Sequence, residues 1–585
     1  MTRSLGAALR KTFALHFALL VLLAPAAALF CESAPTLQLW YWHHSYLTSD
    51  AAVQSSKLLL DRAAEAGYNG VAFWDNSFAA MSDAFWPAAN VERMRTVMQY
   101  ATAKGLRVMG LAAPYGWSNG ALAANGNWAE AQRVIGATFK VNTSATRLDF
   151  VNQFPPLTNE GFEEGRSGWF STGDAGIGLS DVSHGGKHSG VIVDATGNAR
   201  FRQRIVLTPW RQYHLRVWFK SASFTGASAI EVQDWWHRRV LRFRAELDAR
   251  GTQGWTRVDY TFNSQSTTSA YLYFGVWGSS RGMLWFDDVL LEEAALVYVA
   301  RRPGAPLHVY SAEDRRWEFS EGQDYSLIFD PALSPPRAAF RDSYHAPPPV
   351  LLPPKTRLRP SQFVAVDYYA VFPLPLDQQV SLCLTDAAAL HWVEDNARAV
   401  IASMPRGSGV LLSYDEIRQM NSCAGCRETK LSAGDLLASN VRRVTGTVRA
   451  IASAAPLFIW GDMFDPYQNA RSNYYDVEGD LGGSWKGLPP ELTVLNWDRA
   501  HLKQSLTWFS GSDKRQPIAH KQLIASYYDG GNADVIDGEL RTARGIPGIA
   551  GAMYVTWQDD YSQLERFAAA ARRGWDSYGK DANPR

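Results

Sequence analysis

Short runs of β-branched and aromatic residues alternate with amphipathic helical stretches in two separate parts of the chain. Such alternation is typical of βα units arranged around a parallel sheet. About eight units is the number that closes a barrel, so we expect an α/β fold of the (β/α)8 TIM barrel type. The predicted strands are 37–42, 70–74, 106–112, 409–413, 457–460, 492–497, 522–527 and 552–556.

The alternation stops for about 270 residues after the third predicted strand. Residues 157–293 carry Thr-, Tyr-, Trp- and Val-rich runs separated by Gly, Ser and Asn, a pattern that predicts an antiparallel β-sandwich. Residues 294–380 are β-rich and then Pro-rich, which predicts an extended connector. The barrel is therefore predicted in two parts, 35–156 and 381–575, interrupted after strand three by the sandwich.

The first 28 residues have the pattern of an export signal. Basic residues precede an apolar run at 13–23, and the small-residue stretch 25–28 follows it. We expect a secreted or periplasmic protein without a membrane span, because no later window is apolar for about 18 residues. The bulky Phe30 before Cys31 argues against a lipoprotein.

Composition excludes some partners and favours others. The 58 Lys and Arg balance 57 Asp and Glu, so no global field favours nucleic acid. The 22 Trp and 24 Tyr suit stacking on sugar rings, although core packing also accounts for many of them. Cys423 and Cys426 form a lone C-x-x-C, for which a local disulfide or free thiols are expected rather than a zinc site.

Carboxylates and aromatic residues follow the predicted strands four to eight. Glycosidic cleavage explains such a pattern, because one carboxylic acid must protonate the leaving oxygen and a second group must stabilise the positive charge at the anomeric carbon. Paired acids also raise one another's proton affinity, which keeps one of them protonated near neutral pH. The strand ends read Tyr414-Asp415-Glu416, Trp460-Gly461-Asp462, Trp497-Asp498, Tyr527-Tyr528-Asp529 and Trp557-Gln558-Asp559-Asp560.

These strand ends resemble glycoside hydrolase family 20, the β-N-acetylhexosaminidases. The resemblance lies in the Asp-Glu pair after strand four, a Tyr-x-Asp at strand seven and a Trp-x-acid at strand eight. It implies that Glu416 is the general acid, that Asp415 orients the substrate's 2-acetamido group, which acts as the nucleophile, and that Tyr527 hydrogen-bonds the acetamido carbonyl. No catalytic cofactor is implied. The substrate-binding residues implied or proposed are His43, Trp460, Asp462, Trp497, Asp529, Trp557 and Asp559.

Structural roles compete with these assignments. Asp415 and Glu416 could complement a helix N-terminus, since acids there interact favourably with the macrodipole. Asp462, Asp465 and Asp498 could be caps or turn residues. A histidine beside a strand end, such as His43 or His44, is often a satisfied structural donor.

The predicted sandwich resembles the CenC-like carbohydrate-binding modules. The resemblance is carried by Asn159-Glu160-Gly161-Phe162-Glu163 and Gly168-Trp169 at its start and by Trp285-Phe286-Asp287-Asp288-Val289 at its end. It implies a jelly roll with an aromatic sugar groove, for which Trp235 and Trp236 are candidates. It also implies a structural calcium, with Asp287 and either Glu160 or Glu163 as oxygen ligands.

We therefore expect a glycoside hydrolase acting on an oligo- or polysaccharide that contains amino sugars, by a substrate-assisted mechanism. One alternative is a two-carboxylate retaining glycosidase with Glu416 as acid/base and Asp529 as nucleophile. A second alternative is a glycan-binding protein without catalytic activity.

Overall fold

Eight parallel strands form a closed barrel, hydrogen-bonded in the order β1-β2-β3-β19-β21-β23-β24-β25. The structure is a computed structural model that describes residues 36–74, 78, 87–170, 175–234, 240–334, 340, 342–375, 379–527 and 529–581. The predicted closed parallel barrel is confirmed. Its strands are β1 (Gln38–His44), β2 (Gly70–Trp74), β3 (Arg107–Tyr115), β19 (Gly409–Ser413), β21 (Leu457–Trp460), β23 (Leu492–Asn496), β24 (Lys521–Tyr527) and β25 (Ile549–Val555).

The barrel strands are apolar because they are covered on both sides. β19 and β23 are buried at every position, as expected for parallel strands. Their carboxyl ends meet at one rim, so side chains that follow different strands come together there. This rim holds the residues considered below.

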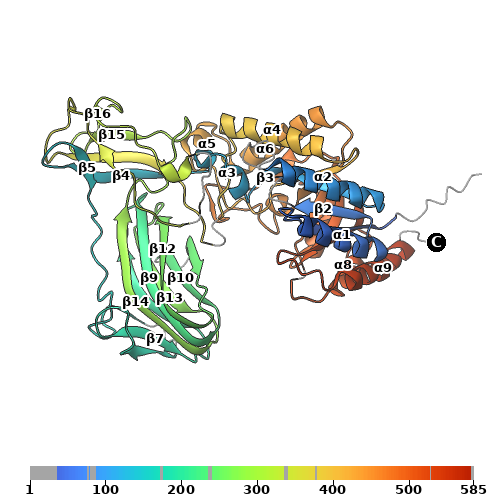
Figure 1. The fold of residues 1–585 in the computed structure, drawn as a ribbon, viewed down its shortest axis with the longest axis horizontal. Coiled ribbons are helices and arrows are strands. Elements are labelled where there is room, and N and C mark those ends of the chain that lie inside the picture. Colours follow the sequence, from blue (N-terminus) through green and yellow to red (C-terminus); the bar gives the residue numbers. More distant parts are fainter. Residues whose placement is uncertain are drawn as a thin grey trace, which may run out of the picture. The chain divides into compact units, whose positions relative to one another are not determined.

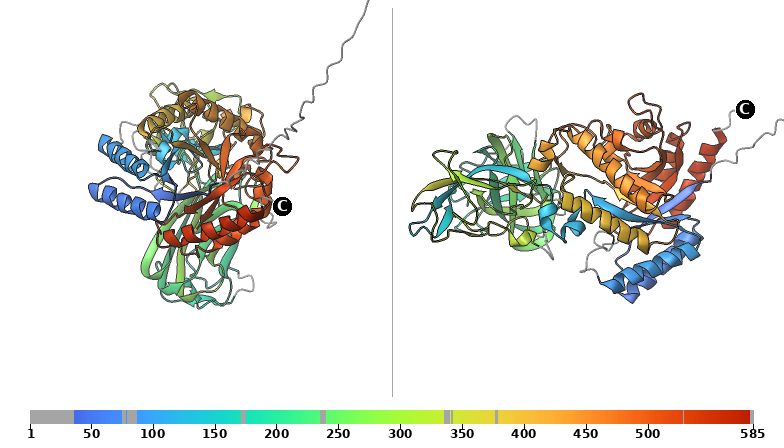
Figure 2. Two further views of the ribbon diagram at one scale, coloured as in Figure 1. Left: turned by 90° about the vertical axis from the view of Figure 1, so that its right-hand side faces the viewer. Right: turned by 90° about the horizontal axis from the view of Figure 1, so that it is seen from above.

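Helices separate most of the barrel strands in the chain. They are α1 (Asp50–Glu65), α2 (Ala88–Ala103), α3 (Asn119–Leu122), α4 (Ala387–Ser403), α5 (Ala424–Glu428), α6 (Ala433–Ile451), α7 (Leu502–Phe509), α8 (Val535–Thr542) and α9 (Leu564–Asp581). Figures 1 and 2 show α1 beside α2 and α8 beside α9. Between β21 and β23 the described chain forms η4 (Asp462–Phe464), β22 (Asp476–Val477) and η5 (Ser484–Gly487), where regular alternation would place an α-helix.

Local chemistry sets several helix starts. The Asp386 carboxylate accepts the backbone N–H of Ala389 at the start of α4, and the Ser432 hydroxyl accepts that of Asp435 at the start of α6. Both contacts satisfy backbone donors that have no partner inside the helix.

None of the helices in the described ranges combines the length and the apolar character that crossing a membrane requires.

Two antiparallel sheets share a second hydrophobic core. Residues such as Ile230 and Phe274 from one sheet and Val217 and Phe286 from the other belong to this core. The first sheet contains β8 (Ala199–Val206), β10 (Ser228–Asp234), β11 (Val240–Glu246) and β13 (Ser269–Val276). The second contains β6 (Ile177–Ser180), β7 (Ser189–Val193), β9 (Gln212–Thr225), β12 (Gly251–Asn263) and β14 (Arg281–Ala294).

A third antiparallel sheet joins two stretches that the sequence pattern had kept apart. Its order is β16-β15-β18-β4-β5-β17, and it has a hydrophobic core of its own. Residues 132–150, which we had predicted within the first barrel part, pair here with residues from the predicted connector. The strands are β4 (Gln132–Val141), β5 (Arg147–Phe150), β15 (His308–Ser311), β16 (Glu318–Phe319), β17 (Val350–Leu351) and β18 (Phe363–Ala370).

Candidate active site

Three carboxyl groups gather where β19 and β21 end. Asp415 and Glu416 follow β19, and Asp462 is the first residue of η4 after β21. The backbone N–H of Glu416 donates to Asp462 Oδ2 at 3.0 Å, and the side chain of Asn469 donates to the same oxygen at 2.8 Å. Asp415 and Asp462 are buried, whereas the side chain of Glu416 is 23% exposed. Glu416 is therefore the member of this group that a ligand reaches most easily.

The backbone that presents these acids is strained. Ser413, Tyr414 and Glu416 have φ values of 54°, 67° and 45°, in the left-handed region that side chains other than glycine rarely adopt. Each such residue costs on the order of 1–3 kcal/mol and persists only where the surroundings enforce it. Here the Tyr414 ring stacks on Tyr115 at 4.9 Å, and its hydroxyl donates to Asn440 at 2.5 Å.

A glycine on the neighbouring strand end lets the chain pass close to Asp415. Gly116 has a φ of 96°, and a Cβ at this position would lie 1.7 Å from the Asp415 carbonyl oxygen. Any other residue would therefore push the segment that carries the acids away from β3.

Burial and mutual repulsion keep protons on this group. The pKa of Asp415 is raised well above its ordinary value by burial and by the charges of Asp462 and Glu416. Burial also raises the pKa of Asp462 to about 7. Two adjacent buried carboxyls thus favour their protonated forms near neutral pH, which is the state expected of groups that take part in acid–base chemistry.

Arg418 supplies the positive charge of the site. Its guanidinium forms an ion pair with Glu416 Oε2 at 2.7 Å and lies over the ring of Tyr475, 4.8 Å from its centroid. Its Nε and Nη1 atoms, the Tyr474 hydroxyl and Asp462 Oδ1 are buried without a hydrogen-bond partner among the described residues. Buried polar groups in this condition need an explanation, and a polar ligand at the strand ends would provide one.

Aromatic rings line the neighbouring strand ends. The Trp42 ring lies 5.4 Å from those of Trp460 and Trp557, and the last two are 6.1 Å apart. Trp42 and Trp460 are buried, whereas Trp557 is 43% exposed. Trp460 is the last residue of β21 and lies two residues before Asp462. The end of β21 therefore connects the three tryptophans to the three carboxyls.

Asp529 holds the turn that carries Trp557. Its carboxylate accepts the Thr556 hydroxyl, the backbone N–H of Trp557 at 2.7 Å and that of Gln558 at 3.2 Å. Asp559, in the same turn, pairs with His44 Nδ1 at 2.7 Å. These two predicted substrate-binding residues thus lie at the rim, where they fix the turn after β25.

Other predicted residues have different positions. His43 is buried against Phe73 and contacts Ser56 Oγ at 3.1 Å, and burial lowers its pKa to about 3. His43 is therefore a neutral, structural histidine. His44 instead contacts Trp557 and Asp559. Trp497 is half-buried, and its indole N–H has no hydrogen-bond partner within the part of the chain that the structure describes. The side chain of Tyr527 lies outside the described residues.

Asp465 and Asp498 have partners of their own. Asp465 accepts the Ser505 hydroxyl and the backbone N–H of Tyr467. Asp498 accepts the backbone N–H of His501 at 2.9 Å. Both match the turn and capping interpretation of these acids.

Sequence reasoning missed Arg418, Tyr474 and Asn469. Only Arg418 gave a usable signal, because it comes two residues after Glu416. Tyr474 and Asn469 come from the long segment between β21 and β23, where no periodic pattern marked them.

In the sandwich, the predicted calcium ligands hold a loop. Asp287 is buried, and its two oxygens accept the backbone N–H groups of His184, Gly185 and Asp288. Burial and then the charge of Asp288 raise the pKa of Glu160. A calcium ion would compete with the three N–H donors on Asp287, so the ion stays a prediction and no step below depends on it. Trp235 and Trp236 lie outside the described residues.

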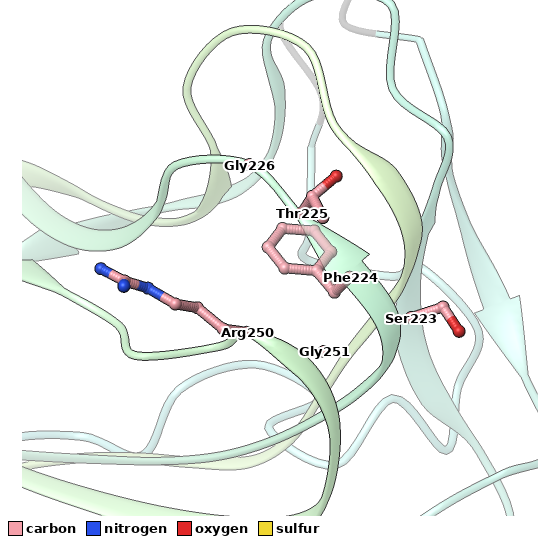
Figure 3. Close-up of a pocket in the computed structure, with 6 residues that line it drawn as sticks. All are labelled: Ser223, Phe224, Thr225, Gly226, Arg250 and Gly251. Atoms are coloured by element: carbon pink, nitrogen blue, oxygen red, sulfur yellow. The ribbon is translucent and has the colours of Figure 1, made fainter. Parts of the chain in front are cut away.

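A hollow in the sandwich offers no comparable chemistry (Figure 3). It is lined by turn residues at the end of β9 and the start of β12, and Arg250 is the one ionisable side chain among the described residues of its lining. The sole aromatic ring in its lining, Phe224, is buried in the core. The candidate active site is therefore the group of side chains at the barrel rim.

The chain matches no protein-family model, and a search of curated proteins gives no match. Solved structures with local similarity include "TmCBM61 in complex with beta-1,4-galactotriose", at 20% identity and a TM-score of 0.20, covering 24% of this chain and 97% of that one. A cyclase from Fischerella sp. TAU has 14% identity and a TM-score of 0.21, covering 25% and 98%. The tailspike protein 4 of bacteriophage CBA120 has 18% identity and a TM-score of 0.20, covering 24% and 21%. Such similarities concern a portion of the fold, and we draw no functional conclusion from them.

Proposed function

We propose that this protein is an exported glycoside hydrolase that cleaves amino-sugar-containing glycans, with Glu416 as the proton donor and the substrate's 2-acetamido group as the nucleophile. The observation that carries the proposal is the contact between Glu416 and Asp462, which joins three carboxyls at the rim of a closed barrel. Glycoside hydrolysis needs a carboxylic acid next to a group that stabilises positive charge.

The three carboxyls can divide these tasks. Glu416, as the partly exposed member, would protonate the leaving oxygen. Asp415 lies next to it in the chain and is buried, so it would orient the acetamido group by accepting a hydrogen bond from its N–H. Asp462 has a pKa of about 7, so it can exchange a proton with its neighbours in the range where an acid–base catalyst works best.

Arg418 sets a condition on this mechanism. It holds Glu416 Oε2 at 2.7 Å, so Glu416 can donate a proton only after a bound substrate has drawn the guanidinium away. The unpartnered Nε and Nη1 atoms of Arg418 could bind sugar hydroxyls in that state. Substrate binding and activation of the acid would then be coupled through one side chain.

The contacts of Asp529 favour the acetamido scheme over a retaining pair. A nucleophilic carboxylate needs an oxygen that is free to attack the anomeric carbon. Both oxygens of Asp529 already accept hydrogen bonds from the turn at Thr556, Trp557 and Gln558, and attack would break them. An enzyme nucleophile is not required when the substrate supplies its own.

The test is a screen of aryl N-acetylglucosaminide, N-acetylgalactosaminide, glucoside and galactoside with the wild type and Glu416→Gln. We expect hydrolysis of the N-acetylated substrates and a loss of about 10²–10⁴-fold in kcat for the variant. Glu394→Gln is a matched control, because Glu394 is also 23% exposed and paired with an arginine, at 3.3 Å. This control should keep full activity.

Two results would replace the proposal. Equal hydrolysis of the glucoside and galactoside would exclude the acetamido nucleophile. No hydrolysis of any substrate, together with glycan binding that Glu416→Gln leaves intact, would identify a glycan-binding protein instead. Export is tested separately: the extracellular or the periplasmic fraction should contain a chain that begins near Leu29.

A further inference from the structure

Three cysteines and one glutamate meet in the interior, apart from the carboxyl group at the rim. They are Cys383, Cys423, Cys426 and Glu130, all of them buried, and their sulfur and oxygen atoms lie within 4.8 Å of one another. Among the described residues this is the one group of at least three cysteine, histidine or acidic side chains with such spacing. We call it the Cys3Glu cluster.

The distances between the ligand atoms of this cluster match those expected between the four ligand atoms of a tetrahedral metal site. Zn²⁺ binds cysteine sulfur at about 2.3 Å and carboxylate oxygen at about 2.0 Å, so tetrahedral edges are about 3.8 Å between two sulfurs and about 3.5 Å between sulfur and oxygen. Cys383 Sγ lies 3.6 Å from Cys423 Sγ and 3.7 Å from Cys426 Sγ. Cys426 Sγ lies 3.6 Å from Glu130 Oε2.

Three chain segments hold the four side chains in place. Glu130 and Cys383 come from two segments paired around the antiparallel bridge between Ala129 and Leu382. Cys423 caps α5, where its sulfur accepts the backbone N–H of Cys426 at 3.4 Å. The ligand set is thus positioned by backbone pairing and a helix start, rather than by flexible loops.

Surrounding groups orient the ligands. The second oxygen of Glu130, Oε1, accepts the backbone N–H groups of Ser422 and Cys423 at 2.7 and 2.8 Å, which leaves Oε2 facing the sulfurs. The Thr385 hydroxyl contacts the sulfurs of Cys383 and Cys426 at 3.4 and 3.3 Å. Outer contacts of this kind fix the ligands of metal sites and tune their affinity.

Charge also favours a divalent cation here. Three thiolates and one carboxylate would bring four negative charges into a buried site, which is costly unless cations compensate them. The Arg302 guanidinium interacts with Cys383, Cys423 and Glu130 and supplies one positive charge. A divalent ion would supply two more.

We infer that the Cys3Glu cluster is a structural zinc site, with Cys383, Cys423, Cys426 and Glu130 as the four ligands. Thiolate ligands select zinc over the hard cations, and four protein ligands leave no open position for catalysis. A disulfide, such as a local one between Cys423 and Cys426, is the competing state, but all three cysteines are free in the structure and the two sulfur–sulfur distances from Cys383 exceed the 2.05 Å of a covalent bond. A disulfide would also use only two of the three sulfurs.

The zinc would fasten the segment that carries the candidate catalytic acids. Gln379, four residues before Cys383, donates to the Glu416 carbonyl oxygen at 2.8 Å. Cys423 lies seven residues after Glu416. The same two segments are therefore joined at both ends, by a hydrogen bond at Glu416 and by the metal at the cysteines.

Metal analysis of the purified full-length chain tests the inference without any assay of catalysis. Wild type should contain about one zinc per chain, and a mercurial that modifies the thiols should release it. Cys383→Ser and Glu130→Gln should each bind zinc at least about tenfold more weakly, in competition with a chromogenic chelator. Glu231→Gln is the control, since Glu231 is buried like Glu130 but pairs with Arg244 in the sandwich and lies outside the cluster, and this variant should keep one zinc.

If Cys383→Ser does not fold, Co²⁺ exchanged into the wild type gives the same answer. A tetrahedral site with three sulfurs should produce intense sulfur-to-cobalt charge-transfer absorption. Three outcomes would overturn the inference: a disulfide between any two of the three cysteines with no bound metal, three free thiols that take up no zinc on dialysis, or stoichiometric iron or copper in place of zinc.

Discussion

The backbone N–H of Glu416 donates to the carboxylate of Asp462 at 3.0 Å, although the two residues are 46 positions apart in the chain. The contact places the end of β19 against the end of β21 and brings a buried acid with a raised pKa next to the partly exposed one. Both the stability of the protein and the proposed chemistry of the site therefore depend on whether Asp462 is protonated.

Asp462→Asn should change how stability depends on pH. The pKa of Asp462 is raised from 3.8 to about 7, so between these values the folded chain holds a proton that the unfolded chain has lost. The contribution of Asp462 is therefore fully present below about pH 4 and is lost as pH rises towards 7, with a slope of at most about 1.4 kcal/mol per pH unit.

The measurement is urea unfolding of the wild type and Asp462→Asn from pH 4.5 to 7.5. The difference between their unfolding free energies should shift in favour of the variant as pH rises. A difference that stays constant over this range would contradict the raised pKa. Because other buried acids titrate in both proteins, only the difference isolates Asp462.

Arg418→Met should move the pH profile of activity upward. Arg418 lowers the pKa of Asp415 and pairs with Glu416, so its removal leaves the carboxyls with less positive charge nearby. Asp415 then holds its proton to a higher pH, and the alkaline fall in activity should occur later. Arg418→Lys, which keeps the charge, should shift the profile less, and equal shifts for the two variants would argue against an electrostatic role.

Asp529→Ala should reduce kcat/KM roughly tenfold to a hundredfold, because the turn that positions Trp557 loses its three hydrogen bonds. Added azide should not restore activity, since Asp529 is not the nucleophile in the proposed mechanism. Rescue by azide with formation of a glycosyl azide would instead support the retaining alternative. Steady-state kinetics with and without azide separate the two.

His43→Leu should affect stability and leave the chemistry intact. The variant loses the contact with Ser56, which is worth about 1 kcal/mol in the free energy of unfolding. Because burial lowers the pKa of His43 to about 3, the side chain is neutral throughout the physiological range, and the pH profile of activity should not move. His44→Leu removes the partner of Asp559 and should raise KM, which makes it the comparison that distinguishes the two histidines.

The barrel strands could be predicted closely, and the third sheet could not. Runs such as 409–413 and 457–460 are apolar at successive positions because both faces are covered, and that pattern is local. The pairing of β4 with β18 joins residues more than 220 positions apart, such as Lys140 and Phe363. No periodicity within either segment specifies a partner at that distance.

The candidate site divides in the same way. The Asp415-Glu416 pair and the acids after the later strands were visible because they end apolar runs. The buried position of His43 depends on which face of β1 packs under the helices. The sequence therefore does not show which of His43 and His44 lies at the site. The residues that contact each ring distinguish the two.

The sequence by itself determined the apolar strands of the parallel barrel, the presence of antiparallel sheets and the acids at the strand ends, because each follows from the order of apolar and polar residues along a short segment. Only the tertiary structure decided that Arg418 pairs with Glu416, that Asp529 is committed to a turn, and that Cys383 approaches a C-x-x-C some 40 residues away. Those relationships depend on distances and burial between segments that are remote in the chain, and burial is what changes the proton affinity of a carboxyl and the charge that a thiolate cluster can tolerate.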